Sequence, residues 1–338
     1  MKTMDPVETN STSNGTMCSV NKEFTFRFLP SVYLIVFVVG LVGNGVGLWN
    51  LCINRKKWTP VNIFVMNLGI ADLLYVITLP FFVAYYTRKE VWQFGYGLCR
   101  LTRCLFHVNM YASISFLTCI SVQRYLGIVH PLKTLVKYQS LRHALVITAL
   151  VWLWVIIQVA PSFFITKNDT DPEYCHDSTS NRHENVKRYT LYTIILTFTG
   201  FFIPFLIIVV CYAKVLNVLW KNKNIDPAVK RRIIKLIGIV LALFFVCFFP
   251  FYILRNFNLF SRLWQLQGKC TPALKSTYIA YQVTRGLASM NSAINPLLYF
   301  VTGENFLLTF KKVKTKTWHA CVYIGRTRNP MLTANADG

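Results

Sequence analysis

Seven long apolar stretches are the feature of this 338-residue chain that most restricts its fold. A helix needs roughly 20 mostly apolar residues to cross the hydrocarbon core of a bilayer, and seven windows of the sequence meet that requirement. Strands of a transmembrane β-barrel would be shorter and would alternate apolar with polar residues, which these windows do not. The expected spans are residues 30–53, 63–86, 101–128, 145–165, 189–212, 233–254 and 278–301. The sequence therefore predicts an all-α membrane protein, a bundle of seven transmembrane helices whose third and seventh members, being more polar, face the protein interior.

The charged residues occupy short runs between these apolar stretches. They make up 14% of the chain, whereas an ordinary soluble domain contains roughly a quarter. A nucleic-acid-binding protein concentrates positive charge on a polar surface, but here the net charge of +23 is dispersed over connecting loops. We therefore expect membrane lipids as partners and no nucleic-acid polymer.

The distribution of basic residues predicts the orientation in the membrane. The loops after the first, third and fifth spans, with the C-terminal tail, contain 20 basic and three acidic residues, and the opposite side contains 16 basic and nine acidic residues. Because basic short loops stay in the cytoplasm, we expect a multi-pass plasma-membrane protein with an extracellular N-terminus and a cytoplasmic C-terminus. Attraction of the basic tail to anionic lipid headgroups is an alternative reason for part of the excess.

The chain divides into three parts on this interpretation. Residues 1–28 are a polar extracellular segment without the charged-then-apolar order of a signal peptide, residues 29–302 are the bundle, and residues 303–338 form the cytoplasmic end. Within that end, residues 304–316 predict a short amphipathic eighth helix on the inner leaflet, and Cys321 is a candidate for palmitoylation. Asn10, Asn14 and Asn168 each begin a glycosylation triplet, and all three fall on the expected extracellular side.

The ten cysteines divide by location. Four of them, Cys18, Cys99, Cys175 and Cys270, fall on the expected extracellular side, where disulfides persist, and four cysteines allow three pairings. No Cys/His cluster has the spacing of a zinc site, and no HExxH, Walker or GxSxG motif is present. The sequence therefore indicates no enzyme.

Polar residues inside the spans predict a buried network. An ionisable residue at bilayer depth is a functional-site hypothesis by default, and Asp72 is such a residue. Asn44, Ser113, Asn291 and Asn295 lie at matching depth. A carboxylate surrounded by hydroxyl and amide oxygens suits a hard cation, and a neutral Asp72 in a hydrogen-bonded polar network is the alternative.

Four prolines inside the spans predict kinks, because proline removes a hydrogen bond from the helix ladder. A kink beside Asn295 and Tyr299 is also a candidate hinge. The four prolines are Pro161, Pro204, Pro250 and Pro296.

Each span carries at least one residue that apolar lipid does not require. In order, these are Gly43-Asn44; Leu68 with Ala71-Asp72; Gln123-Arg124-Tyr125; Trp152 with Pro161; Pro204 with Tyr212; Cys247-Phe248-Phe249-Pro250; and Asn291 with Asn295-Pro296-Leu297-Leu298-Tyr299. The set resembles the rhodopsin-like G-protein-coupled receptors over nearly the whole chain. The resemblance implies a heterotrimeric G protein as partner and sodium as the cation at Asp72, with no other cofactor. It also implies that activation uses Arg124, Tyr212, Pro250, Pro296 and Tyr299.

The sequence departs from that family pattern at two places. Gln123 replaces the usual acid before Arg124, and Lys230, at the cytoplasmic start of the sixth span, is not acidic either. We therefore expect no ionic latch on Arg124 and a weaker barrier to activation. Phe248 stands where many relatives have tryptophan.

The expected extracellular half of the bundle is cationic. The third, sixth and seventh spans each carry an arginine with aromatic or polar neighbours at helical spacing. These residues are Arg103, Phe106, His107 and Tyr111; Tyr252 and Arg255; and Tyr278, Gln282 and Arg285. Guanidinium binds phosphate and carboxylate through paired hydrogen bonds, so we expect three guanidiniums in one cavity to bind an anion. Snorkelling of the arginines to lipid headgroups is the alternative.

Two common ligand classes are excluded by chemistry. An opsin needs a lysine in the seventh span, where Ser289 stands, and an amine receptor needs an acid in the third span, where Phe106 stands. The arginine stripes, with Phe251–Arg255 and Tyr281–Ser289, instead resemble the metabotropic purinergic (nucleotide) receptors, especially the adenine-nucleotide, Gq-coupled branch. Tyr252 departs from that branch, which usually has histidine there.

This narrower resemblance implies two disulfides, Cys99–Cys175 and Cys18–Cys270. It implies a receptor for an extracellular nucleotide that raises calcium through phospholipase C, with further residues around the phosphates and base. These are Lys22, Tyr85, Asp177, Arg262, Tyr278 and Tyr281. Receptors for dicarboxylates such as succinate or oxoglutarate share a similar arginine triad and are the closest alternative. An anion transporter is a distant one, since internal repeats and paired broken helices are not found.

Overall fold

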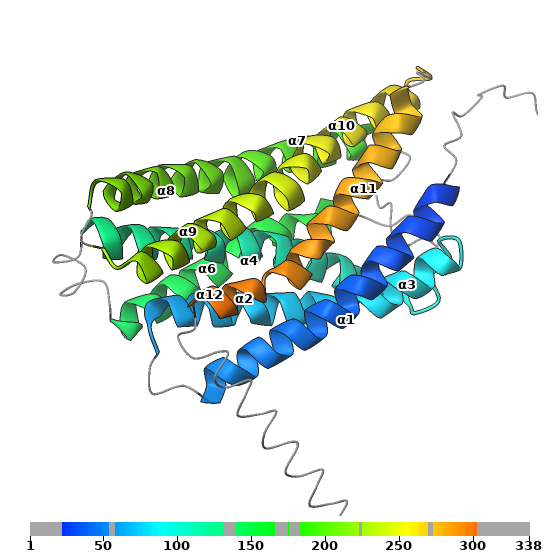
Figure 1. Ribbon diagram of the computed structural model, residues 1–338. Helices are drawn as coiled ribbons and strands as arrows, with labels where there is room; N and C mark the ends of the chain where they lie inside the picture. Colours follow the sequence, from blue (N-terminus) through cyan, green and yellow to red (C-terminus); the bar gives the residue numbers. More distant parts are fainter. Residues whose placement is uncertain are drawn as a thin grey trace, which may run out of the picture.

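The computed structural model describes residues 22–53, 58–130, 140–165, 175, 183–222, 225–269 and 273–302, and within these ranges every regular element is helical. Long helices lie side by side in a bundle (Figure 1). Six segments are long and apolar enough to cross a membrane: Glu23–Ile53, Pro60–Thr87, Tyr96–Val129, Leu141–Ser162, Glu184–Lys221 and Pro227–Leu266. A seventh, more polar segment runs over α11 (Ala273–Ile294) and α12 (Leu297–Thr302). The predicted bundle of seven helices is therefore confirmed.

The helices extend beyond the apolar windows that predicted them. The first begins at Glu23, seven residues before the expected span, so the polar N-terminal part of the chain contributes its first two turns. The first four spans consist of α1 (Glu23–Ile53), α2 (Pro60–Val76) with α3 (Leu79–Thr87), α4 (Tyr96–Val129), and α6 (Leu141–Ile165). The fifth and sixth consist of α7 (His183–Thr197), η2 (Phe198–Phe202) and α8 (Ile203–Lys221), then α9 (Pro227–Ala242), η3 (Leu243–Phe248) and α10 (Phe249–Leu266). The expected eighth helix, 304–316, lies outside the described residues, as does Cys321.

Prolines interrupt the spans at four places. Pro204 and Pro250 each stand in the first turn after a π-helical segment, η2 and η3, and Pro296 stands in the turn between α11 and α12. A π-turn accommodates the hydrogen bond that proline cannot donate. A further interruption that was not predicted occurs at Pro80, which follows the turn that separates α2 from α3. Pro161, which it did include, lies within a continuous α6.

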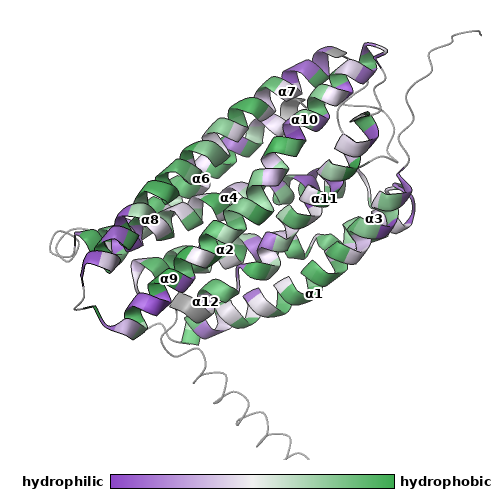
Figure 2. Ribbon diagram, turned by 45° about the horizontal axis from the view of Figure 1, so that its top comes forward, coloured by the Kyte–Doolittle hydropathy of each residue, from purple (hydrophilic) through white to green (hydrophobic). Residues whose placement is uncertain are grey.

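Apolar side chains cover the lateral surface of the bundle. Figure 2 shows hydrophobic residues along the helices and hydrophilic residues gathered towards their two ends. Large apolar side chains such as Leu34, Leu150 and Leu206 are more than half exposed. A water-soluble protein rarely exposes an apolar surface of this extent, so these faces are suited to lipid.

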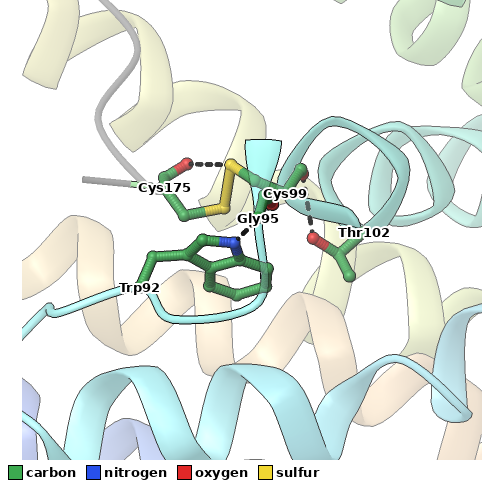
Figure 3. The surroundings of a disulfide bond; sticks show 5 residues. All are labelled: Trp92, Gly95, Cys99, Thr102 and Cys175. Carbon is green, nitrogen blue, oxygen red and sulfur yellow. Dashed lines mark hydrogen bonds between the residues drawn. A yellow bond between two sulfur atoms is a disulfide. The ribbon is translucent and has the colours of Figure 1, made fainter. Parts of the chain in front are cut away.

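A disulfide marks one end of the bundle. Cys99, in the first turn of α4, is bonded to Cys175, and this confirms the pairing that the family resemblance implied. Beside it, the indole Nε1 of Trp92 donates a hydrogen bond of 2.8 Å to the carbonyl oxygen of Gly95 (Figure 3). We call this end the disulfide end and the opposite end, near Arg124, the Arg124 end. Cys18 and Cys270 lie outside the described residues, so their pairing stays a prediction.

Glycines allow Tyr299 of α12 to pack closely against α1 and α2. A Cβ atom at Gly47 would overlap the Tyr299 ring, and one at Gly69 would overlap its hydroxyl. The hydroxyl donates a hydrogen bond of 3.4 Å to the carbonyl oxygen of Val65. The position of Tyr299 therefore depends on two residues without side chains.

We expect Gly47→Ala to destabilise the protein, because overpacking of this kind costs about 1–3 kcal/mol. Thermal unfolding of the detergent-solubilised protein should show a lower Tm, by roughly 2–10 °C. Gly45→Ala is the matched control on the same helix, because a Cβ there meets no atom within 4 Å. Equal Tm values for the two variants would contradict this packing account.

Candidate ligand-binding site

Arg285 of α11 is buried at the disulfide end of the bundle. Only 4% of the residue is exposed. Its Nη1 donates hydrogen bonds to the hydroxyl of Tyr86 at 2.9 Å and to Oε1 of Gln282 at 3.4 Å. Tyr33 and Tyr75 also interact electrostatically with the guanidinium. Hydroxyl oxygens and π faces therefore surround a cation that has no carboxylate partner among the described residues.

Arg255 of α10 is buried to a similar degree, with 5% of the residue exposed. Its guanidinium lies 5.3 Å from the ring centroid of Tyr252 and 5.7 Å from that of Phe251. Nε and Nη2 have no hydrogen-bond partner among the described residues. The side chain thus lies against aromatic faces and close to Tyr111, and two of its buried donor atoms make no hydrogen bond with the described residues.

His107 of α4 is close enough to all three arginines to interact with them electrostatically. These arginines, Arg255, Arg103 and Arg285, belong to three different spans. Arg103 is partly exposed, whereas Arg255 and Arg285 are buried. The structure therefore brings the three guanidiniums around one region, and burial of two of them does not match snorkelling to lipid headgroups.

Aromatic rings form the wall between these charges. Phe106 lies 5.6 Å from Tyr75 and 5.9 Å from Phe251, and Phe251 stacks on Tyr281 at 6.1 Å, measured between ring centroids. Phe106 also faces α10 through Phe251, and Tyr111, further along α4, lies 6.4 Å from the neighbouring Tyr252. The expected stripe of α4 is thus directed at α10 over this length.

Four of the other residues that the resemblance implied belong to segments at the disulfide end, and a fifth falls outside the described residues. Lys22 forms an ion pair with Glu90, with 2.6 Å between Nζ and Oε2. Tyr85 is buried, with its ring 5.9 Å from Trp92. Tyr278 accepts a hydrogen bond of 3.5 Å from Thr25. Arg262 lies two turns beyond Arg255 on α10, and Asp177 falls outside the described residues.

A cluster of polar side chains between α6, α7 and α10 was not predicted from the sequence. Both amide atoms of Gln158 and the hydroxyl of Thr193 are buried without a hydrogen-bond partner among the described residues. The hydroxyls of Tyr111 and Tyr252 share this property. Asn256 contributes an open Oδ1, and its Nδ2 donates to Thr197. A glutamine within the apolar fourth span was the signal that could have indicated this cluster.

The surroundings of Asp72 differ in part from the prediction. Its Oδ2 accepts a hydrogen bond of 2.8 Å from Asn295, as expected, but its Oδ1 accepts one of 2.7 Å from Asn109. Asn109 is a partner that was not predicted from the sequence. Asn44, Ser113 and Asn291 were expected as partners of the carboxylate, but their hydrogen bonds go elsewhere in the same network: Asn291 donates to Ser113, and Asn44 donates to the carbonyl oxygens of Gly40 and Ser292.

The oxygen atoms of this network suit a small cation. Oδ1 of Asn44, Asn291 and Asn295 is buried in each case without a donor among the described residues, and Asp72 supplies the negative charge. Carboxylate and amide oxygens are the donor atoms that hard cations prefer. The residues present therefore fit sodium, and sodium binding stays a prediction.

A model of the family described as 7 transmembrane receptor (rhodopsin family) matches residues 43–299. The chain belongs to this family of receptors. Purinoceptor 1 of Homo sapiens is 40% identical over 306 residues, which cover 88% of this chain and 80% of the relative. Purinoceptor 1 of Gallus gallus is 40% identical over 310 residues, covering 89% and 84%. Purinoceptor 4 of Xenopus laevis is 41% identical over 305 residues, covering 88% and 55%.

Family membership confirms two predictions from the sequence. The resemblance to rhodopsin-like receptors of the purinergic type holds over most of the chain. Since the family consists of receptors, the prediction that the chain is not an enzyme is also confirmed. The chain is a multi-pass membrane protein, with its apolar helices forming the spans.

At the Arg124 end of this rhodopsin-family receptor, the arginine of the third span has no carboxylate partner in the described part of the chain. Arg124 forms no ion pair with any described residue, and its buried Nε has no hydrogen-bond partner among them. The charged group that acts on it is Arg232, a like charge, and the neighbouring Tyr212 accepts a hydrogen bond of 2.7 Å from Ser121. The missing ion pair agrees with the sequence, in which Gln123 and Lys230 stand where acidic partners of Arg124 are usual.

We expect Gln123→Asp to lower ligand-independent signalling, because a carboxylate beside Arg124 would stabilise the resting arrangement. A shift of about 1 kcal/mol would reduce the active population roughly fivefold. Basal G-protein activation in cells, normalised to surface expression, measures this effect. Gln123→Asn, which adds no charge, is the control, and unchanged basal signalling in Gln123→Asp would show that the missing latch has no consequence.

Proposed function

We propose that the protein is a plasma-membrane receptor for an extracellular nucleotide di- or triphosphate, with an adenine nucleotide as the expected agonist. It would signal through Gq, phospholipase C and calcium. The observation that carries the proposal is that two arginines, Arg255 and Arg285, are buried on the adjacent helices α10 and α11 and act together with Arg103 on His107 of α4. Relatives named purinoceptors, 38–41% identical to this chain, support the same ligand class.

The charge of the site favours an anion with several charged oxygens. Burying an arginine in a membrane helix is unfavourable by about 2.5–3.5 kcal/mol at the helix centre, and three guanidiniums near one another add mutual repulsion. A phosphate chain offers paired acceptors to each guanidinium. Such a ligand would offset both unfavourable contributions, and it would reach the open Nε and Nη2 of Arg255.

The polar cluster at Gln158 favours a nucleotide over a dicarboxylate. Gln158, Thr193 and Asn256 offer donors and acceptors that are buried and open within the bundle. An uncharged ligand part with several hydrogen-bonding atoms, such as a ribose or a purine base, would satisfy them. Succinate and oxoglutarate lack such a part, so the cluster would remain open with either of them bound.

We further propose that the disulfide end is extracellular. Disulfides persist in oxidising compartments, and the Cys99–Cys175 bond lies at the same end as the arginine site. The opposite loops are the more basic ones, as expected for the cytoplasm. A ligand from outside the cell would then enter directly between α4, α10 and α11.

Ligand binding would bias a conformational equilibrium between the two ends of the bundle. Phosphates that bridge α4, α10 and α11 would draw their extracellular ends together. The interruptions at η2, η3 and Pro296 offer hinges, and the Asp72 network joins α2 and α4 to the end of α11 and the turn that follows it. Outward movement of α8 and α9 would open a groove for a G-protein helix beside Arg124.

Arg285→Ala should abolish the response to ATP and ADP, because it removes the buried cation and leaves Tyr86 and Gln282 without their bonded donor. A loss of at least a hundredfold in potency corresponds to about 2.8 kcal/mol. Calcium release at matched surface expression measures it. Arg27→Ala is the control, because Arg27 is 83% exposed in its side chain and pairs with Glu23 on the outer face of α1. Unchanged potency in Arg285→Ala would refute the site.

A panel of ligands separates the alternatives. Calcium responses to ADP, ATP and UTP without responses to succinate or oxoglutarate are the expected result, and the reverse pattern would identify a dicarboxylate receptor. Uptake of a radiolabelled anion in cells without G-protein signalling would identify a transporter.

A further inference from the structure

Glu90 is a buried carboxylate at the disulfide end. Of the five acidic residues in the described part of the chain, Asp72 and Glu90 are buried, and the side chain of Glu90 is 9% exposed. Its Oε2 lies 2.6 Å from Nζ of Lys22, whose side chain is 38% exposed. A carboxylate with so little access to water depends on this ammonium group for its stabilisation.

The backbone around Glu90 is specialised to place this carboxylate. Lys89 and Glu90 have φ angles of 54° and 68°, the left-handed region in which glycine usually ends a helix. The N–H of Glu90 donates to the carbonyl oxygen of Tyr85 at 2.9 Å, and the N–H of Lys89 donates to that of Tyr86 at 3.2 Å. The end of α3 is therefore closed by a turn that glycine would adopt more readily but that carries a glutamate.

The ion pair stands on the same wall of the bundle as Arg285. Tyr86, four residues before Glu90, accepts the hydrogen bond from Arg285, and Tyr33 of α1 lies 6.1 Å from Tyr86 between ring centroids. Lys22 directly precedes α1, so the pair joins the ends of α1 and α3. Thr25, in the first turn of α1, donates a hydrogen bond to Tyr278 of α11. Tyr278 precedes Arg285 by seven residues, which is about 10 Å along the helix.

We propose that Glu90 is an internal counter-anion, which competes with the anionic ligand for Lys22 and thereby sets the potency of the receptor. This inference rests on the proposed nucleotide function. Without ligand, Glu90 holds the ammonium group at the rim of the arginine site. A phosphate chain bound at Arg285 captures Lys22 only by displacing Glu90, and it then faces a buried negative charge. A longer phosphate chain carries more negative charge toward Lys22 and meets more of this competition, so Glu90 lowers the potency of ATP more than that of AMP.

The test is a double-mutant cycle in full-length receptor, with calcium responses to ATP, ADP and AMP at matched surface expression. Glu90→Gln should raise the potency of ATP and ADP about tenfold, because the negative charge at position 90 no longer competes with the ligand for Lys22. Lys22→Gln should lower potency, and it should lower it more in the Glu90→Gln background than in the natural sequence. The increase in Glu90→Gln should be larger for ATP than for AMP.

Glu23→Gln is the matched control. It removes the same charge one residue from Lys22, but the Glu23 side chain is 66% exposed and pairs with Arg27. We expect its potency to equal that of the natural receptor, which separates a local competition from a general change in charge. Glu90→Asp, which keeps the charge but shortens its reach to Lys22, should give an intermediate increase and serves where Glu90→Gln does not reach the surface.

Two results would overturn the inference. One is an equal effect of Lys22→Gln in both backgrounds, which would mean that Glu90 does not compete for the ammonium group. The other is a potency in Glu90→Gln, or in Glu90→Asp where that variant is the one expressed, that does not exceed the potency of Glu23→Gln. Absence of any nucleotide response in the natural receptor would instead refute the proposed function.

Discussion

Burial of arginine within a lipid-covered bundle is the constraint on which the remaining structure depends. A guanidinium is always charged, so Arg255 and Arg285 must find compensation from the protein or from a ligand. Within the part of the chain that the structure describes, hydroxyl oxygens and aromatic faces from Tyr86, Tyr252 and Phe251 fill this role, and no carboxylate does. Neutral partners stabilise the cations without cancelling their charge, which stays available to the anionic ligand that we propose.

The same segments that hold the site also interrupt the helices. The π-helical η3 and Pro250 precede Tyr252 and Arg255, and the turn at Pro296 follows the seventh-span residues that reach Asp72 through Asn295. Interrupted helices have fewer backbone hydrogen bonds in register and bend at lower cost than continuous ones. The disulfide end and the Arg124 end are thus connected through helices that can bend at these interruptions, and Tyr299 adds a packing contact that only glycines allow.

Much of this arrangement could be predicted from the sequence, because it depends on local periodicity. Span lengths follow from apolar runs, and spacings of three and four residues place each arginine on one face of its helix with its aromatic or polar neighbours. What could not be predicted depends on the rotation and depth of one helix relative to another. Asn109 bonds Asp72 although Ser113, one turn further along α4, was expected there. Glu90 pairs with Lys22, which lies 68 residues away in the sequence. Its backbone has a left-handed conformation that the preferences of glutamate do not predict.

The most direct test of the central claim is the structure of the purified receptor with a non-hydrolysable nucleotide triphosphate. The account predicts phosphate density between α4, α10 and α11, with oxygen atoms within about 3 Å of the guanidiniums of Arg255 and Arg285. It predicts the uncharged part of the ligand beside Gln158. Nucleotide bound outside the bundle, with both guanidiniums still enclosed by their tyrosine partners, would contradict the account.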